Sequence, residues 1–442
     1  MRNIFAGQLE RQFKLKENGT CFSTEVVAGI TTFATMAYVL AVVPKLMGEA
    51  GLPAGAILTA MVLMIFVTTL AMGLYTNRPF ALAPGMGGVA IFSITLVQLQ
   101  KIPIAVACGI VFLSGLLFVM VTAFGIRDLI VKIIPKGIKI SISAGVGLFL
   151  CVLGLRNAKI IAASTEKTAL AFGNLSQPMV ALAVISFVIL LILETRKIRG
   201  SALITILLTT LIGIPMGLTK IPATFFSMPT SIAPVAFHFD VVGAFKLKYI
   251  PYLFAFFLPD FFSSLGTALG VSSKAGFLDQ NGDLPGLNKV FIVDSIAATL
   301  GSLFTIPVLI TYLESGAGVA VGGRTGLTAI TTAFFFLSVL FFTPVALMIP
   351  AAATASILVY VGVSMLLGMR NIDFLDATEY MPAFLCIALT VFTFNIGNGI
   401  AVAFISYVIM KVAAGRMKDL AYGHYLLAII LIYYFYSLTA LK

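Results

Sequence analysis

The sequence predicts an all-α polytopic membrane protein, and three observations support this prediction. Hydrophobic residues make up 60% of the 442 residues and charged residues only 10%, against about 45–50% and about 25% in soluble domains. Apolar stretches suited to helical spans of about 20 residues recur from Val26 to Leu441. The alternating pattern of a membrane β-barrel is absent. The chain is therefore expected to cross a lipid bilayer many times as helices.

The first half of the chain, residues 1–218, contains a series of apolar segments. They are expected at about 26–43, 57–75, 80–96, 104–124, 141–155, 179–193 and 202–218. Between the fourth and the fifth, lysines recur among isoleucines from Arg127 to Lys139, which suits an amphipathic helix at the cytoplasmic surface. Residues 219–248 are polar and contain prolines, and they are the expected external connection between two halves.

The second half, residues 249–442, repeats this organisation. Its segments are expected at about 249–271, 287–304, 305–318, 328–349, 353–367, 383–394 and 401–412. The basic loops all fall on one side if the N-terminus is cytoplasmic, which gives about 14 crossings. Because each half has an odd number of spans, the two halves are expected to be inverted repeats. The last apolar stretch, Tyr425 to Leu441, is either a fifteenth crossing or a helix on the surface.

The net charge of +11 does not predict a nucleic-acid partner, because the basic residues are spread over short loops and do not form one patch. The cysteines are scattered without metal-ligand spacing, so no metal and no cofactor are predicted. The polar start, residues 1–17, precedes a full-length span and is unlike a cleavable signal peptide. We expect a multi-pass protein of a bacterial inner (cytoplasmic) membrane with a cytoplasmic N-terminus.

Two segments are interrupted by proline and glycine at corresponding positions of the halves. One contains Ala81-Leu-Ala-Pro-Gly-Met-Gly-Gly88, and the other runs from Thr305 to Gly318. Paired interrupted segments of this kind indicate the binding site of a transporter, because unpaired backbone groups are tolerated within a membrane only where they line a cavity. The alternative is that Pro84 and Pro307 only kink two ordinary helices.

Two carboxylates lie within the apolar segments. Glu314 follows an apolar run, and an ionisable group at that depth is a functional candidate for binding a ligand or a proton; the alternative is a structural pair with Arg324. Asp260 is expected to share a polar stripe with Ser263, Ser264 and Thr267. Asp260 has two alternative roles. It contacts a ligand or binds a proton, or it forms hydrogen bonds with the backbone of a broken helix.

Two further acidic residues, Glu25 and Asp294, are expected to be structural anchors near the ends of spans.

Several motifs in order along the chain resemble the adenine/guanine/hypoxanthine permease branch of the nucleobase–cation symporters. They are Thr24-Glu-Val-Val-Ala-Gly-Ile-Thr-Thr-Phe33 with Met36-Ala-Tyr38, Ala81-Leu-Ala-Pro-Gly-Met-Gly87, Ile142-Ser-Ala-Gly-Val-Gly-Leu-Phe149, Gly270-Val-Ser-Ser-Lys-Ala-Gly276 and Thr311-Tyr-Leu-Glu-Ser-Gly-Ala-Gly-Val-Ala-Val-Gly-Gly-Arg-Thr-Gly-Leu-Thr328. The resemblance implies a seven-plus-seven inverted repeat. It also implies a core domain of spans 1–4 and 8–11, a gate domain of the others, and a short strand with a half-helix in segments 3 and 10.

The resemblance also implies site residues. The family's base-binding glutamate falls on Glu314, its second binding carboxylate on Ser263, and its asparagine after the Pro-Gly-Met-Gly motif on Val89. Further contacts are expected from the broken segments and from the span at 249–271. Backbone N–H groups at the two half-helix ends are expected to read the edge of a base together with Glu314, and a phenylalanine is expected to cover one face. These further residues are Gly88, Thr311, Ser315, Phe92 and Phe262.

The leading hypothesis is a purine nucleobase:proton symporter that works by alternating access and is not an enzyme. Ser263 and Val89 replace an acidic and a polar group, and they leave a second hypothesis open: a transporter of a different small heterocycle or organic anion. A non-transporting ligand receptor is a third hypothesis. A membrane enzyme is disfavoured because the spans contain no histidine. Whether the protein forms a homodimer through its gate helices stays open.

Overall fold

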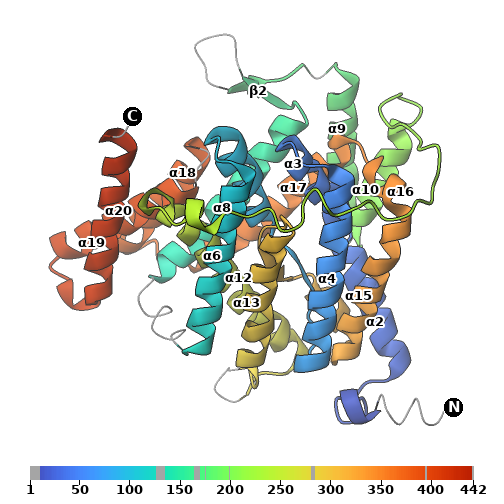
Figure 1. Ribbon diagram of the computed structural model, residues 1–442, viewed down its shortest axis with the longest axis horizontal. Coiled ribbons are helices and arrows are strands. Elements are labelled where there is room, and N and C mark those ends of the chain that lie inside the picture. The colour runs from blue at the N-terminus through green and yellow to red at the C-terminus, as the bar shows by residue number, and fades with distance from the viewer. Residues whose placement is uncertain are drawn as a thin grey trace.

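The structure is a computed structural model that describes residues 10–125, 135–163, 170–174, 176–198, 200–279, 284–393 and 396–440. Most of these residues are helical (Figure 1). The surface helix expected from Arg127 to Lys139 falls largely outside the described residues.

The elements of the first half follow the expected order. They are α2 (Phe22–Met36), α3 (Val39–Glu49), α4 (Ala54–Thr76), β1 (Leu82–Pro84), α5 (Met86–Ala90), a π-helix (Ile91–Leu99), α6 (Ile104–Ala123), α8 (Lys136–Asn157), β2 (Ile161–Ala163), β3 (Leu170–Phe172), α9 (Pro178–Thr195) and α10 (Ser201–Gly213). The first expected span is divided at Ala37 and Tyr38, which the sequence analysis did not predict.

The second half also keeps its order. Its elements are α11 (Val241–Ala244), a 3₁₀ turn (Leu247–Tyr249), α12 (Ile250–Ala275), α13 (Leu287–Leu303), β4 (Leu309–Thr311), α14 (Ser315–Ala320), α15 (Gly326–Ser338), a 3₁₀ turn (Val339–Phe342), α16 (Thr343–Leu347), α17 (Ala351–Leu366), a 3₁₀ turn (Leu367–Asn371), α18 (Ala377–Phe392), α19 (Ile396–Ala413), a 3₁₀ turn (Met417–Asp419) and α20 (Tyr422–Ala440). The last apolar stretch is thus a helix that packs on α19.

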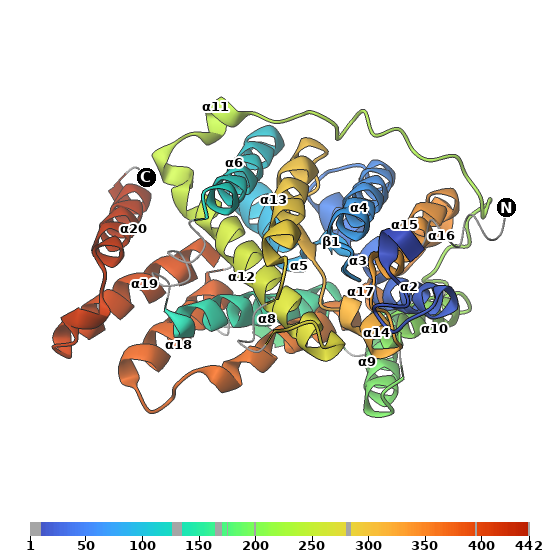
Figure 2. The ribbon, with the colours of Figure 1, turned by 90° about the horizontal axis from the view of Figure 1, so that it is seen from below.

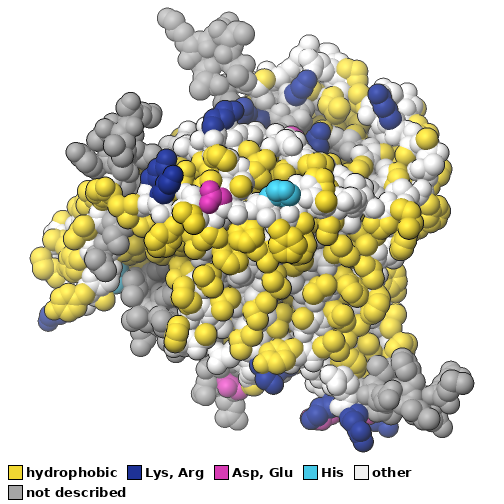
Figure 3. Space-filling view, in the orientation of Figure 1, with side chains coloured by type: hydrophobic (Ala, Val, Ile, Leu, Met, Phe, Trp, Pro, Cys, Tyr) yellow, Lys and Arg dark blue, Asp and Glu magenta, His cyan; other side chains and the backbone are white. Residues whose placement is uncertain are grey.

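The predicted membrane character is confirmed by the helices. Among the described residues, eight helices are long and apolar enough to cross a membrane, and shorter apolar helices accompany them. On the face shown in Figure 3, hydrophobic side chains form a broad band, and most of the lysines and arginines lie above or below it. This distribution suits a protein whose middle contacts lipid and whose ends contact water.

The helices pack into two groups, which we call the core group and the gate group. In the core group α2, α3, α4, α6, α12, α13 and α15 pack with one another around the two broken segments, and in the gate group α8, α9, α10, α17, α18 and α19 do so. The gate group lies mainly along the lower side of Figure 2. Residues 219–240 form an extended connection that crosses one face of the molecule (Figures 1 and 2).

The two broken segments meet inside the core group. Strand β1 pairs antiparallel with β4, so that Leu82 lies opposite Thr311 and Pro84 opposite Leu309. Each strand is followed directly by a short helix, α5 or α14. The prediction of a strand and a half-helix in segments 3 and 10 is therefore confirmed, and the alternative of two merely kinked helices is wrong. The pairing satisfies backbone groups that lipid could not satisfy.

Close packing holds each group together. In the gate group, a methyl group added at Gly147 of α8 would lie 2.5 Å from the carbonyl oxygen of Gly362 in α17. These glycines let the two backbones touch, as is common between membrane helices. In the core group, aromatic rings of α6, α12 and α13 form a cluster in which the ring of α6 packs edge-to-face on the other two. Its members are Phe118, Phe261 and Phe291.

Candidate functional site

Glu314 lies between β4 and α14, where the two broken segments meet. Its side chain is half-buried, and its Oε1 accepts a hydrogen bond from the Tyr38 hydroxyl at 2.8 Å. Among the described residues, no donor is bonded to Oε2. The expected alternative, a pair with Arg324, is wrong, because that guanidinium donates to the backbone carbonyls of Val319 and Gly323. Glu314 therefore keeps hydrogen-bonding capacity for a ligand.

Tyr38 is the site residue that the sequence analysis missed. It lies in the division between α2 and α3, so the break in the first span places a hydroxyl beside Glu314. The Tyr312 side chain lies next to Tyr38, and its hydroxyl donates to the carbonyl oxygen of Pro84 in β1. A tyrosine within an apolar span was the available signal, because a buried phenol needs a hydrogen-bond partner.

Ser315 and Thr69 fix the position of β1. The Oγ of Ser315 accepts a hydrogen bond from the backbone N–H of Ala81 at 3.0 Å. The Thr69 hydroxyl of α4 contacts the backbone of Leu82, accepting from its N–H at 3.0 Å and donating to its carbonyl at 3.3 Å. Ser315 is fully buried and its oxygen accepts from the first residue before β1, so it holds the two broken segments together.

The backbone N–H groups at the start of α14 are also occupied. Ser315, Gly316 and Ala317 each donate to the carbonyl oxygen three residues earlier, at 2.9–3.1 Å. The expectation that N–H groups of this half-helix read the edge of a ligand is therefore wrong. The side chain of Glu314 is the polar group that this end of the helix offers.

Thr311 faces a buried acidic pair and not Glu314. Its hydroxyl donates to Oδ1 of Asp294 at 2.9 Å. Asp294 is fully buried in the middle of α13, so the expectation that it lies near a span end is wrong. Asp260 of α12, which is 4% exposed, lies within electrostatic range of Asp294. Ser264, also of α12, lies beside Asp294. The two aspartates and Thr311 thus form a polar cluster that joins α12, α13 and β4.

The expected polar stripe on α12 divides between two faces. Ser264 and Thr267 are buried on the same side as Asp260, whereas Ser263 is exposed. Nothing lies within 4 Å of a methyl group built on Gly266, so this second face of α12 is open. The open face carries Ser263, the position where the resemblance places a carboxylate.

The first broken segment supplies mainly apolar surface. Val89 is fully buried, and its N–H and carbonyl groups are used within the helix by Gly85 and Ser93. Phe92 is 1% exposed within the apolar core. Gly88 is half-buried, with Val308 as its nearest neighbour. The side chain of Phe262 lies outside the described residues.

Glu25 has a different environment from Glu314. It is fully buried near the start of α2, and its carboxylate accepts hydrogen bonds from the backbone N–H groups of Arg324, Thr325 and Thr328 at 2.8–3.2 Å. The Thr328 hydroxyl donates to the same carboxylate at 2.6 Å. Glu25 therefore binds α2 to the start of α15, as expected for a structural anchor.

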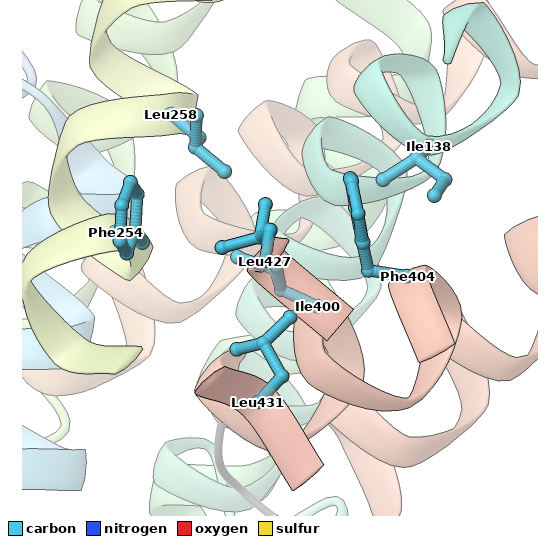
Figure 4. Close-up of a pocket in the computed structure, with 7 residues that line it drawn as sticks. All are labelled: Ile138, Phe254, Leu258, Ile400, Phe404, Leu427 and Leu431. Atoms are coloured by element: carbon cyan, nitrogen blue, oxygen red, sulfur yellow. The ribbon is translucent and has the colours of Figure 1, made fainter. Parts of the chain in front are cut away.

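A pocket lies between α8, α12, α19 and α20 (Figure 4), and Glu314 is not among the residues that line it. Its lining is apolar: Ile138, Phe254, Leu258, Ile400, Phe404, Leu427 and Leu431. Such a lining cannot recognise the hydrogen-bonding groups of a polar solute, and it suits a lipid chain. The site around Glu314 is the better candidate because a polar group lies there at the junction of the repeats.

Known structures share the fold of this chain. The transmembrane domain of a cyanobacterial bicarbonate transporter, BicA, superimposes with a TM-score of 0.62 over 86% of this chain and 96% of that domain, at 19% identity. SLC26A9 gives a TM-score of 0.66 over 92% of this chain and 67% of that protein, at 14% identity. The fold is that of membrane transporters with a seven-plus-seven inverted repeat and core and gate domains.

Sequence comparisons identify the family within that class. Residues 23–406 match the family model Xan_ur_permease, described as Permease family, and the chain belongs to this family. Adenine permease AdeP of Escherichia coli is 40% identical over 94% of this chain and 93% of its own length. Guanine/hypoxanthine permease PbuO of Bacillus subtilis is 35% identical over 97% of this chain and 100% of its own length. The chain is thus a multi-pass membrane protein whose relatives are purine permeases.

Proposed function

We propose that the protein is a purine nucleobase permease that couples uptake to protons and works by alternating access between its core and gate groups. The observation that supports this most directly is Glu314, which has one oxygen held by Tyr38 and the other without a donor among the described residues. A carboxylate accepts hydrogen bonds from the N–H groups at the edge of a purine, and its surroundings of low polarity strengthen such bonds. The names of the relatives AdeP and PbuO support the same class of substrate.

The coupled proton has two candidate positions in this proposal. One is Glu314 itself. The other is Asp260, which is buried within electrostatic range of Asp294 and has no hydrogen-bond donor to Oδ1 among the described residues. Two carboxylates buried within electrostatic range of each other repel when both are ionised, and a proton on one of them relieves the repulsion. The proposal includes an inner-membrane location with a cytoplasmic N-terminus.

The test is uptake of radiolabelled adenine, guanine, hypoxanthine, xanthine and uracil by cells that lack their own base permeases. Saturable uptake of a purine that a protonophore abolishes is expected. Uptake of no base by cells whose membranes contain the protein contradicts the proposal. Purine binding without uptake identifies a receptor.

A second candidate is a permease of the same fold for another small heterocycle or an organic anion. Ser263 favours it, because the open face of α12 carries a hydroxyl where the resemblance places a carboxylate. Substrate uptake that a protonophore leaves unchanged would favour this candidate over proton symport.

A further inference from the structure

A groove lies at the end of the molecule where the connection between the two halves reaches α12. Its volume is about 210 Å³. Its lining includes Ile110 and Leu113 from α6, and Ile250 and Leu253 from α12. Leu113 lies in the third turn of α6, so at 1.5 Å per residue the groove extends about 14 Å along that helix. This is about half of the roughly 30 Å hydrocarbon core of a bilayer, the depth of one leaflet.

The rim of the groove is fastened to the core group. The backbone N–H of Asp240 donates to the carbonyl oxygen of Ala105 at 2.8 Å, and the rings of Phe112 and Phe239 stack with their centres 5.4 Å apart. Helix α11 packs on α6 (Figure 2). A methyl group added at Gly109 of α6 would lie 2.2 Å from the carbonyl oxygen of Asp240. The shape of the groove is therefore set by the packing of the connection on α6.

Large apolar side chains of the lining are exposed. Phe245 is 81% exposed and Leu247 is 56% exposed, and both line the groove. They lie at the start of the apolar stretch that crosses the membrane as α12. Exposed apolar side chains at the start of a span contact lipid chains and not water. The open side of the groove is therefore expected to face the bilayer.

Two ammonium groups lie at the groove. Lys246 is part of its lining, and Nζ of Lys248 lies 5.0 Å from the centre of the Tyr249 ring, which also lines the groove. Both lysines are exposed. Among the described residues no carboxylate forms an ion pair with either lysine. The carboxylate of Asp240, earlier in the connection, accepts from the N–H of Gly243 at 2.7 Å. The groove therefore combines an apolar interior with positive charge at its edge.

We propose that this groove binds a phospholipid with a net negative head group, taken from the leaflet that it faces. One acyl chain fills the groove along α6 and α12, and the phosphate lies between the ammonium groups of Lys246 and Lys248. The bound lipid fixes the depth of this end of the core group in the bilayer. The pocket of Figure 4 has no charged residue in its lining and so offers no group to a phosphate. This site is independent of which molecule the protein transports.

The experiment titrates the purified full-length protein with dioleoyl phosphatidylglycerol or dioleoyl phosphatidylcholine and measures the first bound lipid by native mass spectrometry. The two lipids have the same chains, but only the first has a net negative charge. Wild type should bind phosphatidylglycerol roughly tenfold more tightly, and Lys246→Gln/Lys248→Gln should remove this preference. The matched control is Lys220→Gln/Lys418→Gln, which removes the same charge from exposed lysines outside the lining and should keep the preference.

The apolar part of the site is tested by filling the groove. Leu113→Phe adds volume from α6 and Leu253→Phe adds volume from α12, and both keep the two lysines. Each should weaken the binding of phosphatidylglycerol, because the acyl chain loses its space. The unfolding temperature of each variant in lipid-free detergent shows that it is folded. Added phosphatidylglycerol should raise the unfolding temperature of wild type more than that of any groove variant.

Several outcomes overturn the proposal. Equal affinity of wild type for the two lipids rejects the role of the lysines. A loss of preference in Lys220→Gln/Lys418→Gln as large as in Lys246→Gln/Lys248→Gln shows general attraction to the protein surface and no site. Unchanged binding in both folded groove-filling variants rejects the groove. A lipid-free dimer that the groove-filling variants dissociate identifies this face as an interface between two copies of the chain. None of these outcomes bears on uptake of a base, so the proposed function is tested separately.

Discussion

Glu25 and Glu314 are both glutamates placed among apolar helices, but their surroundings differ. The carboxylate of Glu25 accepts hydrogen bonds from three backbone N–H groups and one hydroxyl at the junction of α2 and α15. Glu314, at the junction of the broken segments, accepts one hydrogen bond from the part of the chain that the structure describes, from Tyr38. A carboxylate whose acceptor capacity is filled by the protein stabilises the fold, whereas one with free capacity can bind a ligand.

The comparison also explains why an acidic residue within an apolar segment does not by itself identify a binding site. Both glutamates are costly to bury, and each is retained for a reason. For Glu25 the reason is visible in its donors, which belong to the turn that starts α15. Among the described residues Glu314 has one donor, Tyr38, and its other oxygen is left for a ligand. The following predictions test this distinction, from the largest expected effect to the smallest.

Glu314→Gln should lower purine uptake by up to about 100-fold, because a hydrogen bond to a charged group is worth about 3 kcal/mol at most and the neutral amide loses it. Membrane abundance should stay normal, since the amide oxygen still accepts from Tyr38. Uptake by transfected cells and immunoblotting of their membranes measure the two effects. The control is Glu379→Gln, whose partner Lys411 keeps two other carboxylates, Asp376 and Asp419. Uptake by Glu314→Gln within about threefold of wild type would contradict the assignment.

Glu25→Ala should show the opposite pattern, with loss of folded protein as its main effect. The substitution leaves three buried N–H groups without their acceptor, and breaking such a network costs about 3–5 kcal/mol. The detergent-solubilised variant should unfold at a clearly lower temperature in a fluorescence-detected thermal assay. A wild-type unfolding temperature together with lost uptake would assign Glu25 to transport and remove the distinction between the two glutamates.

Tyr38→Phe should reduce uptake by roughly tenfold, because the variant removes the donor that orients Oε1 of Glu314. The effect should be smaller than that of Glu314→Gln, since the carboxylate itself remains. Uptake measured over a range of purine concentrations gives the change in KM. Tyr312→Phe is the matched comparison, because that hydroxyl supports the β1 carbonyl of Pro84 and not Glu314. An effect of Tyr312→Phe on KM as large as that of Tyr38→Phe would contradict the assigned roles.

Cys21 provides a chemical readout of the Glu25 region. It precedes α2, outside the membrane-spanning segment, and hydrogen bonds from Ser23 and Thr24 lower the pKa of its thiol to about 7. Because the thiolate is the reactive form, alkylation by a maleimide should reach half its maximal rate near pH 7. The other three cysteines are buried and should react slowly.

Glu25→Ala should raise the pH at which Cys21 alkylation reaches half its maximal rate, toward the ordinary thiol pKa of 9.0, because the start of α2 loosens. Glu314→Gln should leave it unchanged. Cys21→Ala identifies the signal, because it should abolish the fast labelling. Equal shifts in both glutamate variants would show that the two regions are coupled.

The sequence by itself determined the class of protein and the outline of its site. The fraction of apolar residues could not be hidden from water in a soluble fold, so many helical spans were required. The paired prolines Pro84 and Pro307 placed the broken segments, and the structure joins them as β1 and β4. Glu314 was recognisable because the cost of burying a charge makes such residues rare.

The tertiary structure decided which polar groups meet and which are already satisfied. Nothing in the local sequence divides the first span at Tyr38, because that division depends on the phenol finding Glu314 in a segment of the other half. Thr311, Ser315 and Glu25 look equally able to bind a ligand, but in the folded chain Thr311 donates to Asp294, Ser315 accepts from Ala81, and Glu25 accepts from the start of α15. The chain supplies donors and acceptors, and only packing in three dimensions determines which of them remain free for a ligand.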